Sequence, residues 1–366
     1  MEHKKVLVAG DSGVVGLAAA RHFSGLPGWD VVGVSRRILQ LPHGGEHVAV
    51  NLQDRKQCAA VFSQMRDVTH LIYAAVYEKP GLVSGWRERE QMETNLAMLS
   101  NILDPLEEAS TRLEHVTLMQ GTKAYGVHLG LMALPGKERS PRHRHENFYW
   151  LQEDYLREKQ AGGRGWGWTV LRPQAVFGEA LGSNMNPIPA LGVYAALQRH
   201  AGLPLDYPGG PPYVLEAVDA DLIARAMHWA ATTPEARDEY FNVTNGDVFV
   251  WRNVWPTLAD AFGMEVGEDR PTSMAEEMPK RKDAWEEIVR RFDLRAPVSL
   301  EAFVGQSFYY TDFLLGAGLQ EAPPPALVST IKLRKAGFQD CMDTEDMLRK
   351  YIDYFQRERL FPPIDR

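Results

Sequence analysis

Residues 5–25, KVLVAGDSGVVGLAAARHFSG, join an apolar run, a glycine-rich turn and an alanine-rich amphipathic segment. The run at 5–9 is typical of a buried parallel strand, and the segment at 14–25 is typical of a helix. The turn at 10–16, GDSGVVG, has GxxGxxG spacing in the strand–turn–helix context that a dinucleotide requires. Its glycines permit a tight turn, a close approach of the backbone to a pyrophosphate at the helix N-terminus, and close packing of helix on strand. This stretch therefore predicts a dinucleotide-binding βαβ unit.

The same alternation continues outward from this unit. Further strands are predicted at 31–35, 47–50, 70–74, 114–119 and 167–172, and helices near 54–66, 85–109 and 147–161. Strands that alternate with helices favour an α/β fold, a Rossmann-type doubly wound parallel sheet, over residues 1–175. In residues 176–366 this alternation of strands and helices stops. The sequence there predicts a smaller, mainly helical substrate-binding lobe, with 214–246 as a candidate for return to the Rossmann core.

Composition and charge exclude several classes of protein. The chain has 366 residues, of which 45% are hydrophobic and 24% charged, a balance that excludes disorder and fibres. A formal charge of −8, with Lys280–Lys282 as the densest basic run, argues against nucleic acid as a partner. The two cysteines, Cys58 and Cys341, cannot make a disulfide framework, and the apolar N-terminal run is too short to be a signal peptide or to span a membrane. We therefore expect a cytoplasmic protein with no membrane partner.

The end of the second predicted strand indicates which nicotinamide cofactor is bound. An NAD enzyme normally carries Asp or Glu there, about 20 residues beyond the glycines. This chain has Ser35, Arg36 and Arg37, and guanidinium groups can bind a 2′-phosphate bidentately. The sequence thus favours NADP(H), the alternative being a pair of surface arginines. Asp54, after the third strand, could approach the adenine or cap the next helix.

Two segments make the chain recognisable. The fifth strand is followed by GTKAYG at 121–126, and NFYW at 147–150 begins a helix. With the glycine turn, they resemble the extended short-chain dehydrogenase/reductases, and more narrowly the enone reductases related to progesterone 5β-reductase and iridoid synthase. Other similar segments are WTVLRP at 168–173, NMN at 184–186, DADLIA at 219–224 and FNVTNGDVF at 241–249. The resemblance covers about residues 5–265 and is faint beyond.

The resemblance implies an NADPH-dependent enzyme that needs no flavin or metal. Its catalytic residues would be Tyr149 and Lys123. The predicted cofactor-binding residues are Gly10, Ser12, Gly13, Val14, Val15, Gly16, Ser35, Arg36, Arg37, Asp54, Thr122, Pro173 and Val176. The implied substrate is a small apolar enone or enal, and a homodimer is left open.

Departures from an ordinary short-chain dehydrogenase favour a particular reaction. Those enzymes pair a Ser with a Tyr that is followed by a Lys one helical turn later. Here the Ser position is Gly121, and Glu153 follows Tyr149. In conjugate reduction, hydride reaches the β-carbon and charge develops on the carbonyl oxygen as an enolate. Tyr149 and Lys123 suffice as an oxyanion site for that charge, while the α-carbon takes its proton from water. We therefore expect 1,4-reduction of α,β-unsaturated carbonyl compounds.

The sequence leaves two alternative functions and several residues without an assigned role. The chain could be a carbonyl reductase or nucleotide-sugar epimerase of the same extended family, or a non-catalytic NADP-binding sensor. Asn95 is a candidate for ordering backbone or water near the site, and Tyr125 for packing below it. His143 and His145 are more typical of a basic loop than of a metal pair. Aromatic residues that could line a pocket, but more often form core, are Trp86, Phe308, Tyr309, Tyr310 and Phe313.

Overall fold

The computed structural model describes residues 3–37, 45–80, 84–130 and 132–364. They form two compact units, each built from three separate stretches of the chain. The first, here called the sheet unit, comprises residues up to Gln174 together with Ala220–Thr244 and Val328–Asp340. The second, here called the helical unit, comprises Ala175–Asp219, Asn245–Leu327 and Cys341–Arg366.

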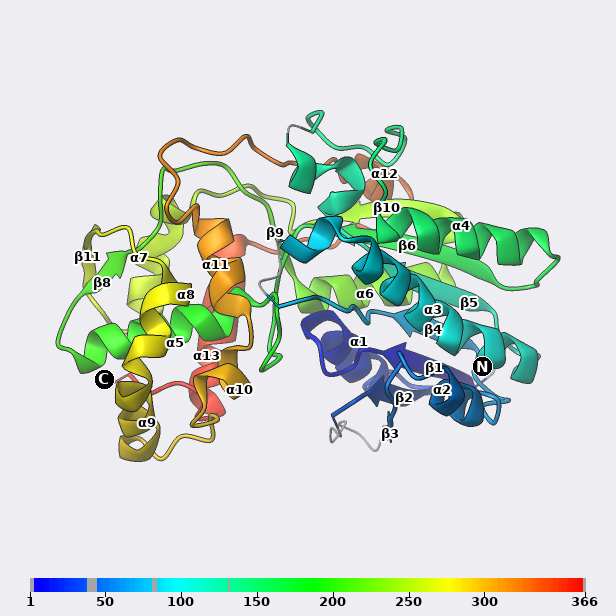
Figure 1. Ribbon diagram of the computed structural model, residues 1–366, viewed down its shortest axis with the longest axis horizontal. Coiled ribbons are helices and arrows are strands. Elements are labelled where there is room, and N and C mark those ends of the chain that lie inside the picture. Colours follow the sequence, from blue (N-terminus) through cyan, green and yellow to red (C-terminus); the bar gives the residue numbers. More distant parts are fainter. Residues whose placement is uncertain (1–2, 38–44, 81–83, 131, 365–366) are drawn as a thin grey trace. The chain divides into compact units, whose positions relative to one another are not determined.

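The sheet unit is organised around seven parallel strands (Figure 1). They are β1 (Lys4–Ala9), β2 (Trp29–Ser35), β3 (Glu46–Ala49), β4 (His70–Tyr73), β5 (His115–Met119), β6 (Gly167–Pro173) and β10 (Glu239–Val243). Their order is β10-β6-β5-β4-β1-β2-β3, and every pair is parallel. The order therefore reverses between β1 and β4, which is where a doubly wound sheet binds its ligand, at the carboxyl ends of the strands.

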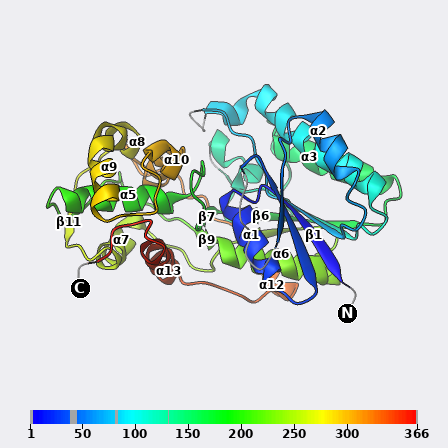
Figure 2. The same cartoon turned by 90° about the horizontal axis from the view of Figure 1, so that it is seen from below.

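Helices cover both faces of this sheet. They are α1 (Val14–Ser24), α2 (Arg55–Phe62), α3 (Arg89–Ala109), α4 (Phe148–Ala161), α6 (Ala220–Thr232) and the short α12 (Ile331–Lys335). Helix α1 packs on α6, while α3 packs on both α2 and α4. Figure 2 shows α2 and α3 on one side of the strands and α1 and α6 on the other. Because both faces are covered, the central strands are largely apolar and buried, and Val6–Ala9 of β1 are completely buried.

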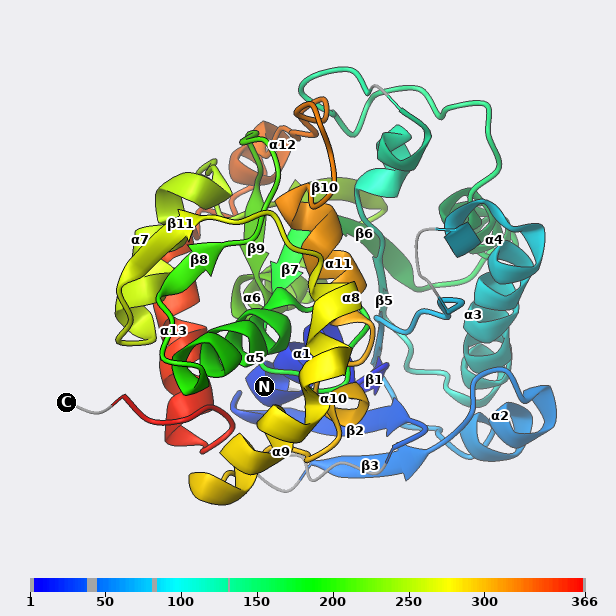
Figure 3. The same cartoon turned by 60° about the vertical axis from the view of Figure 1, so that its left-hand side comes forward.

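The helical unit has a separate core. Its helices are α5 (Pro187–His200), α7 (Trp251–Ala261), α8 (Met274–Glu277), α9 (Lys282–Arg291), α10 (Leu300–Val304), α11 (Ser307–Leu315) and α13 (Thr344–Arg357). Two short strand pairs join β7 (Ala175–Phe177) to β9 (Ala217–Asp219) and β8 (Leu205–Tyr207) to β11 (Val266–Asp269). Helix α5, apolar on nearly all sides, contacts α9, α10, α11 and α13 (Figure 3). A helix that is apolar all round must be enclosed by others, so α5 forms the centre of this unit.

The predicted Rossmann-type parallel sheet is confirmed, with all six strands of residues 1–175 at their expected places. The sheet unit also contains 220–244, within the predicted return segment, and 328–340, which the sequence analysis assigned to the substrate lobe. Val328 forms a β-bridge with Gly136, and the Lys332 ammonium forms an ion pair with Glu239 at 2.5 Å. These contacts hold residues 328–340 in the sheet unit. None of the helices in the described ranges is long and apolar enough to cross a bilayer.

Candidate active site

The glycine turn after β1 is closely packed. Gly10 has φ of +89°, and a Cβ atom there would lie 2.7 Å from the backbone nitrogen of Ala75. A Cβ at Gly16 would lie 2.2 Å from the Gly10 carbonyl oxygen. Neither position accepts a side chain, so helix α1 starts close against the turn, and the amide groups of its first turn have no acceptor within the helix. Asp11 is fully buried behind the turn, 3.3 Å from His47, and burial raises the pKa of its carboxyl group.

The basic pair at the end of β2 lies beside this turn. The Arg37 guanidinium donates a hydrogen bond of 3.0 Å to the carbonyl of Ser12, and both Arg36 and Arg37 are exposed. The Ser35 hydroxyl donates to the Arg37 carbonyl at 2.8 Å, which fixes the turn out of the strand. Arg37 is thus held against the glycine turn, with Arg36 next to it in the chain. Asp54, by contrast, accepts from the amides of Lys56 and Gln57 at 3.0 Å and caps α2.

The fold brings Lys123 and Tyr149 together. Lys123 lies in a single 3₁₀ turn (Thr122–Tyr125) that follows β5, and Tyr149 in the first turn of α4. The Asn147 side chain joins them, because its oxygen accepts from the Tyr149 amide at 3.1 Å and its nitrogen donates to the Lys123 carbonyl at 3.0 Å. The Lys123 ammonium nitrogen lies 5.9 Å from the centre of the Tyr149 ring. The helix N-cap is therefore also the link between the two predicted catalytic residues.

Gly121 makes room for the phenol. A Cβ atom at Gly121 would lie 3.2 Å from the Tyr149 hydroxyl oxygen. The position where an ordinary short-chain dehydrogenase carries Ser is thus adjacent to the Tyr149 hydroxyl group itself. Tyr149 is only 6% exposed and packs with Phe148, Trp150 and Met92. Its ring is therefore held by packing.

Lys123 is held by a residue that the sequence analysis missed. Its ammonium nitrogen lies 3.3 Å from the carboxylate of Glu78, whose side chain is completely buried. It also lies 4.3 Å from the centre of the Trp86 indole and 5.5 Å from that of the Phe148 ring. Glu78 follows β4, the strand next to β5. An acidic residue just beyond the carboxyl end of a central strand was the signal that could have revealed it.

Glu153, which stands where an ordinary short-chain dehydrogenase has Lys, is part of a network of ion pairs. Its two oxygens accept from Arg172 and Arg142, each at 2.7 Å. Arg172 also donates to Gln120 at 3.1 Å, and Gln120 donates to the Tyr149 carbonyl at 3.2 Å. Glu153 thus braces helix α4 against β6, and its charge is committed to arginines.

The remaining predicted residues occupy varied places. Thr122 donates to Gln174 at 2.9 Å, and Pro173 ends β6. Val14 and Val15 begin α1, whereas Val176 lies on β7 in the helical unit.

Asn95 and Tyr125 have clear structural partners. Asn95 bonds to both the amide and the carbonyl of Tyr77 at 2.9 Å, which is the predicted backbone-ordering role. The Tyr125 hydroxyl donates to Asn242 at 2.5 Å, and burial raises its pKa.

The remaining candidate residues are two histidines and five aromatic residues. His143 and His145 lie in a loop, and His143 bonds to the Lys123 carbonyl at 3.2 Å. Throughout the described ranges, no group of three or more His, Cys, Asp or Glu side chains could hold a metal ion. Trp86 belongs to the Lys123 site, whereas the other four aromatics lie on α11, where Phe308 is buried and Tyr309 and Phe313 are about half exposed.

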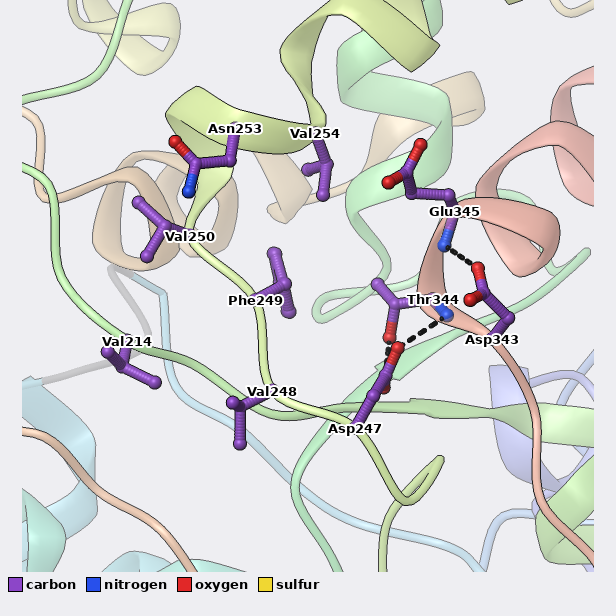
Figure 4. A pocket seen from close by; sticks show the side chains of 10 residues that line it. All are labelled: Val214, Asp247, Val248, Phe249, Val250, Asn253, Val254, Asp343, Thr344 and Glu345. Atoms are coloured by element: carbon purple, nitrogen blue, oxygen red, sulfur yellow. Dashed lines mark hydrogen bonds between the residues drawn. The ribbon is translucent and has the colours of Figure 1, made fainter.

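A separate cavity lies within the helical unit. It has a volume of about 260 Å³ and is lined by Val214, Asp247, Val248, Phe249, Val250, Asn253, Val254, Asp343, Thr344 and Glu345. Figure 4 shows the Asp247 carboxylate bound to the amide and hydroxyl of Thr344, at the start of α13. None of its lining residues belongs to the predicted site, so this cavity is distinct from the Lys123 and Tyr149 arrangement.

Comparisons with known proteins identify the family. A family described as the PRISE-like Rossmann-fold domain matches residues 55–313. The chain is 34% identical to (S)-8-oxocitronellyl enol synthase CYC2 of Camptotheca acuminata over 97% of this chain and 93% of that protein. It is 31% identical to the 3-oxo-Δ(4,5)-steroid 5β-reductase of Arabidopsis thaliana over 97% of this chain and 92% of that protein.

Solved structures give the fold. A UDP-glucose 4-epimerase of Thermotoga maritima superimposes with a TM-score of 0.67 at 17% identity, covering 96% of this chain and 99% of the epimerase. A Thermus thermophilus UDP-glucose 4-epimerase in complex with NAD gives a TM-score of 0.63 at 19% identity, covering 96% and 99%. The fold is thus shared with nucleotide-sugar epimerases, while the extent and identity of the sequence matches assign the family. This chain belongs to the PRISE-like Rossmann-fold family.

Proposed function

We propose that this chain is an NADPH-dependent enone reductase, which reduces the C=C bond of α,β-unsaturated ketones and aldehydes by 1,4-addition. The observation that carries the proposal is the Lys123–Tyr149 pair, with Gly121 beside the phenol and Glu153 committed to arginines. The relatives support this type of reaction, since one is named as a reductase of a 3-oxo-Δ(4,5)-steroid, which is a conjugated enone.

The cofactor fits residues of the sheet unit. The turn that includes Gly10 and Gly16 leaves room only for backbone, and its helix N-terminus suits a pyrophosphate. Arg36 and Arg37 are exposed beside that turn and would hold a 2′-phosphate, which supports NADPH over NADH. When bound, this cofactor supplies hydride to the substrate.

The protein's own contribution is to stabilise negative charge on the substrate oxygen. The Tyr149 hydroxyl donates a hydrogen bond to the carbonyl oxygen, and the Lys123 ammonium adds positive charge from the β5 side. Asn147 ties the backbones of the two residues together and packing holds the Tyr149 ring, so we expect little reorganisation as the enolate forms. The enol then takes its α-proton from water, and no relay through a lysine on α4 is required.

Carbonyl reduction is the competing hypothesis for the reaction, since epimerases and carbonyl reductases share the fold. It requires protonation of an alkoxide, for which the usual Ser and Lys are absent from positions 121 and 153. A non-catalytic sensor would have no use for the held Lys123 and Tyr149 pair.

The test follows hydride into the product. With cyclohex-2-enone and NADPH deuterated at the 4-pro-S position, the face that the short-chain dehydrogenase resemblance implies, we expect cyclohexanone labelled at the β-carbon. With ordinary NADPH in deuterated water, the label should appear at the α-carbon. An allylic alcohol labelled at the carbinol carbon would establish a carbonyl reductase, and NADPH binding without turnover of any of several enones and enals would favour the sensor.

A further inference from the structure

The buried carboxylate of Glu78 receives three hydrogen-bond donors. One oxygen lies 3.3 Å from the Lys123 ammonium nitrogen. The other accepts from the Trp86 indole N–H at 3.1 Å and from the Gln91 amide at 2.6 Å. A carboxylate is the one side chain of this size with two oxygens that only accept. The three donors therefore match the two acceptor oxygens of a carboxylate at this position.

Helix α3 fixes the segment that carries Glu78. Gln91 accepts from the amide of Lys79 at 3.0 Å while it donates to Glu78, and Asn95 holds both backbone groups of Tyr77. Gln91 and Asn95 are one helical turn apart on α3 and are almost fully buried. The residues on both sides of Glu78 are thus tethered to one rigid helix.

The Lys123 ammonium group needs a negatively charged partner that is itself held in place. Its side chain is only 11% exposed, and the rings of Trp86, Phe148 and Tyr149 surround its ammonium group. Aromatic faces attract a cation but do not fix its direction, whereas a long lysine side chain has many rotamers to lose. A buried charge also requires a counter-charge. Glu78 supplies both direction and charge.

We propose that Glu78 is the positioning residue of this active site, and that it holds the Lys123 ammonium against the Trp86 ring, on the side of the Tyr149 phenol. In catalytic terms the inference rests on the proposed function, because Lys123 matters to turnover only if it helps to hold the substrate oxygen. Trp86 has two roles. Its indole N–H orients Glu78, and its ring face covers the Lys123 ammonium that Glu78 holds.

Glu78→Gln is the informative change, because it keeps the size but has one acceptor oxygen and an NH₂ group. Whichever way that amide turns, an N–H group meets a donor, and Lys123 loses the counter-charge that holds its ammonium group. We expect kcat for cyclohexenone to fall about 10–100-fold, the scale of a misplaced catalytic group, with the NADPH dissociation constant within about twofold of the parent. Glu88→Gln, which removes an exposed carboxylate bound to Lys79 at 2.6 Å, is the matched control and should leave both unchanged.

A double-mutant cycle separates positioning from general damage. In a Lys123→Met background, Glu78→Gln should lower kcat by less than about twofold, because the group that it positions is gone. Equal fold-losses in both backgrounds, or a parent-like Glu78→Gln enzyme, would overturn the proposal.

An NMR experiment tests the same contact without turnover. With lysine labelled with ¹³C at the ε-carbon, the Lys123 signal, identified by its absence in Lys123→Met, should carry a ring-current shift from Trp86. We expect this shift to collapse toward that of exposed lysines in Glu78→Gln and to persist in Glu88→Gln. If the parent reduces no enone, the proposed function fails, but the shift still decides the positioning. An unchanged Lys123 signal in Glu78→Gln would refute the positioning itself.

Discussion

A single methyl group at Gly121 would test the geometry on which the proposed oxyanion site depends. A Cβ atom there would lie 3.2 Å from the Tyr149 hydroxyl oxygen and 3.5 Å from the Pro173 carbonyl oxygen. The backbone at Gly121 is extended, with φ of 177°, so Gly121→Ala adds volume without backbone strain. The first contact is closer than ordinary van der Waals packing, and the hydroxyl must retreat by a few tenths of an ångström.

The size of the effect follows from that displacement. A misplacement of 1 Å can cost about 100-fold in rate, so a shift of about 0.3–0.5 Å, scaled linearly in free energy, costs about 4–10-fold. We expect kcat for cyclohexenone in Gly121→Ala to fall by that factor, with unchanged NADPH affinity by fluorescence titration. Gly121→Ser places the same Cβ and should not gain carbonyl reduction, since Glu153 still stands where the relay lysine would be.

Gly165→Ala is the matched control, because a Cβ at Gly165 meets nothing within 4 Å. It should have parent kinetics. If Gly121→Ala also turns over at the parent rate, the Tyr149 hydroxyl does not act from the place where the structure has it, and our account of the site is wrong.

Tyr149→Phe should lower turnover about 10²–10³-fold, the usual cost of one oxyanion donor, with NADPH binding intact by titration; parent-like rates on several enones would mean that another group holds the oxygen. Replacing Arg36 and Arg37 with Ala should remove most of a preference for NADPH over NADH that we expect to be at least tenfold, as loss of a charge-assisted bond costs about 1.5–3 kcal/mol; equal affinities in the parent would refute the assignment. Burial lowers the pKa of His70 and of His115 to about 3, so both are neutral when folded, whereas the unfolded chain protonates them near pH 6.5. Stability in urea should therefore fall as the pH drops from about 6.5 toward 3, and an equal decline in a variant with Phe at both histidine positions would exclude them as the cause.

The sheet was predictable because its signals are local. The apolar run before Gly10 and the glycine spacing that follows lie within one short stretch, and each later strand reads as a buried run bounded by turn residues. The Lys123 and Tyr149 pair was predictable because both residues sit where a strand ends or a helix begins. The resemblance to a known family then joined them.

Glu78 was not predictable in the same way. It lies 45 residues before Lys123, and only the parallel pairing of β4 with β5 brings them together. The segment at 328–340 has a short helix and a single bridging residue, and no periodic pattern marks it as part of the sheet unit. Asp54 shows a third limit, because a cofactor contact and a helix cap demand the same residue type at the same place.

The interleaving of the two units along the chain has a consequence for synthesis on the ribosome. Strand β6 lacks its neighbour β10 until Glu239–Val243 has emerged, and α12, which packs against β10, follows almost 90 residues later. Until β10 has emerged, β6, a strand that is fully buried in the folded protein, has an unpaired edge, which is the kind of template on which nascent chains associate. The last stretch of the sheet unit to be synthesised, Val328–Asp340, is therefore a late closing step, and changes there should lower the yield of folded enzyme more than its activity once folded.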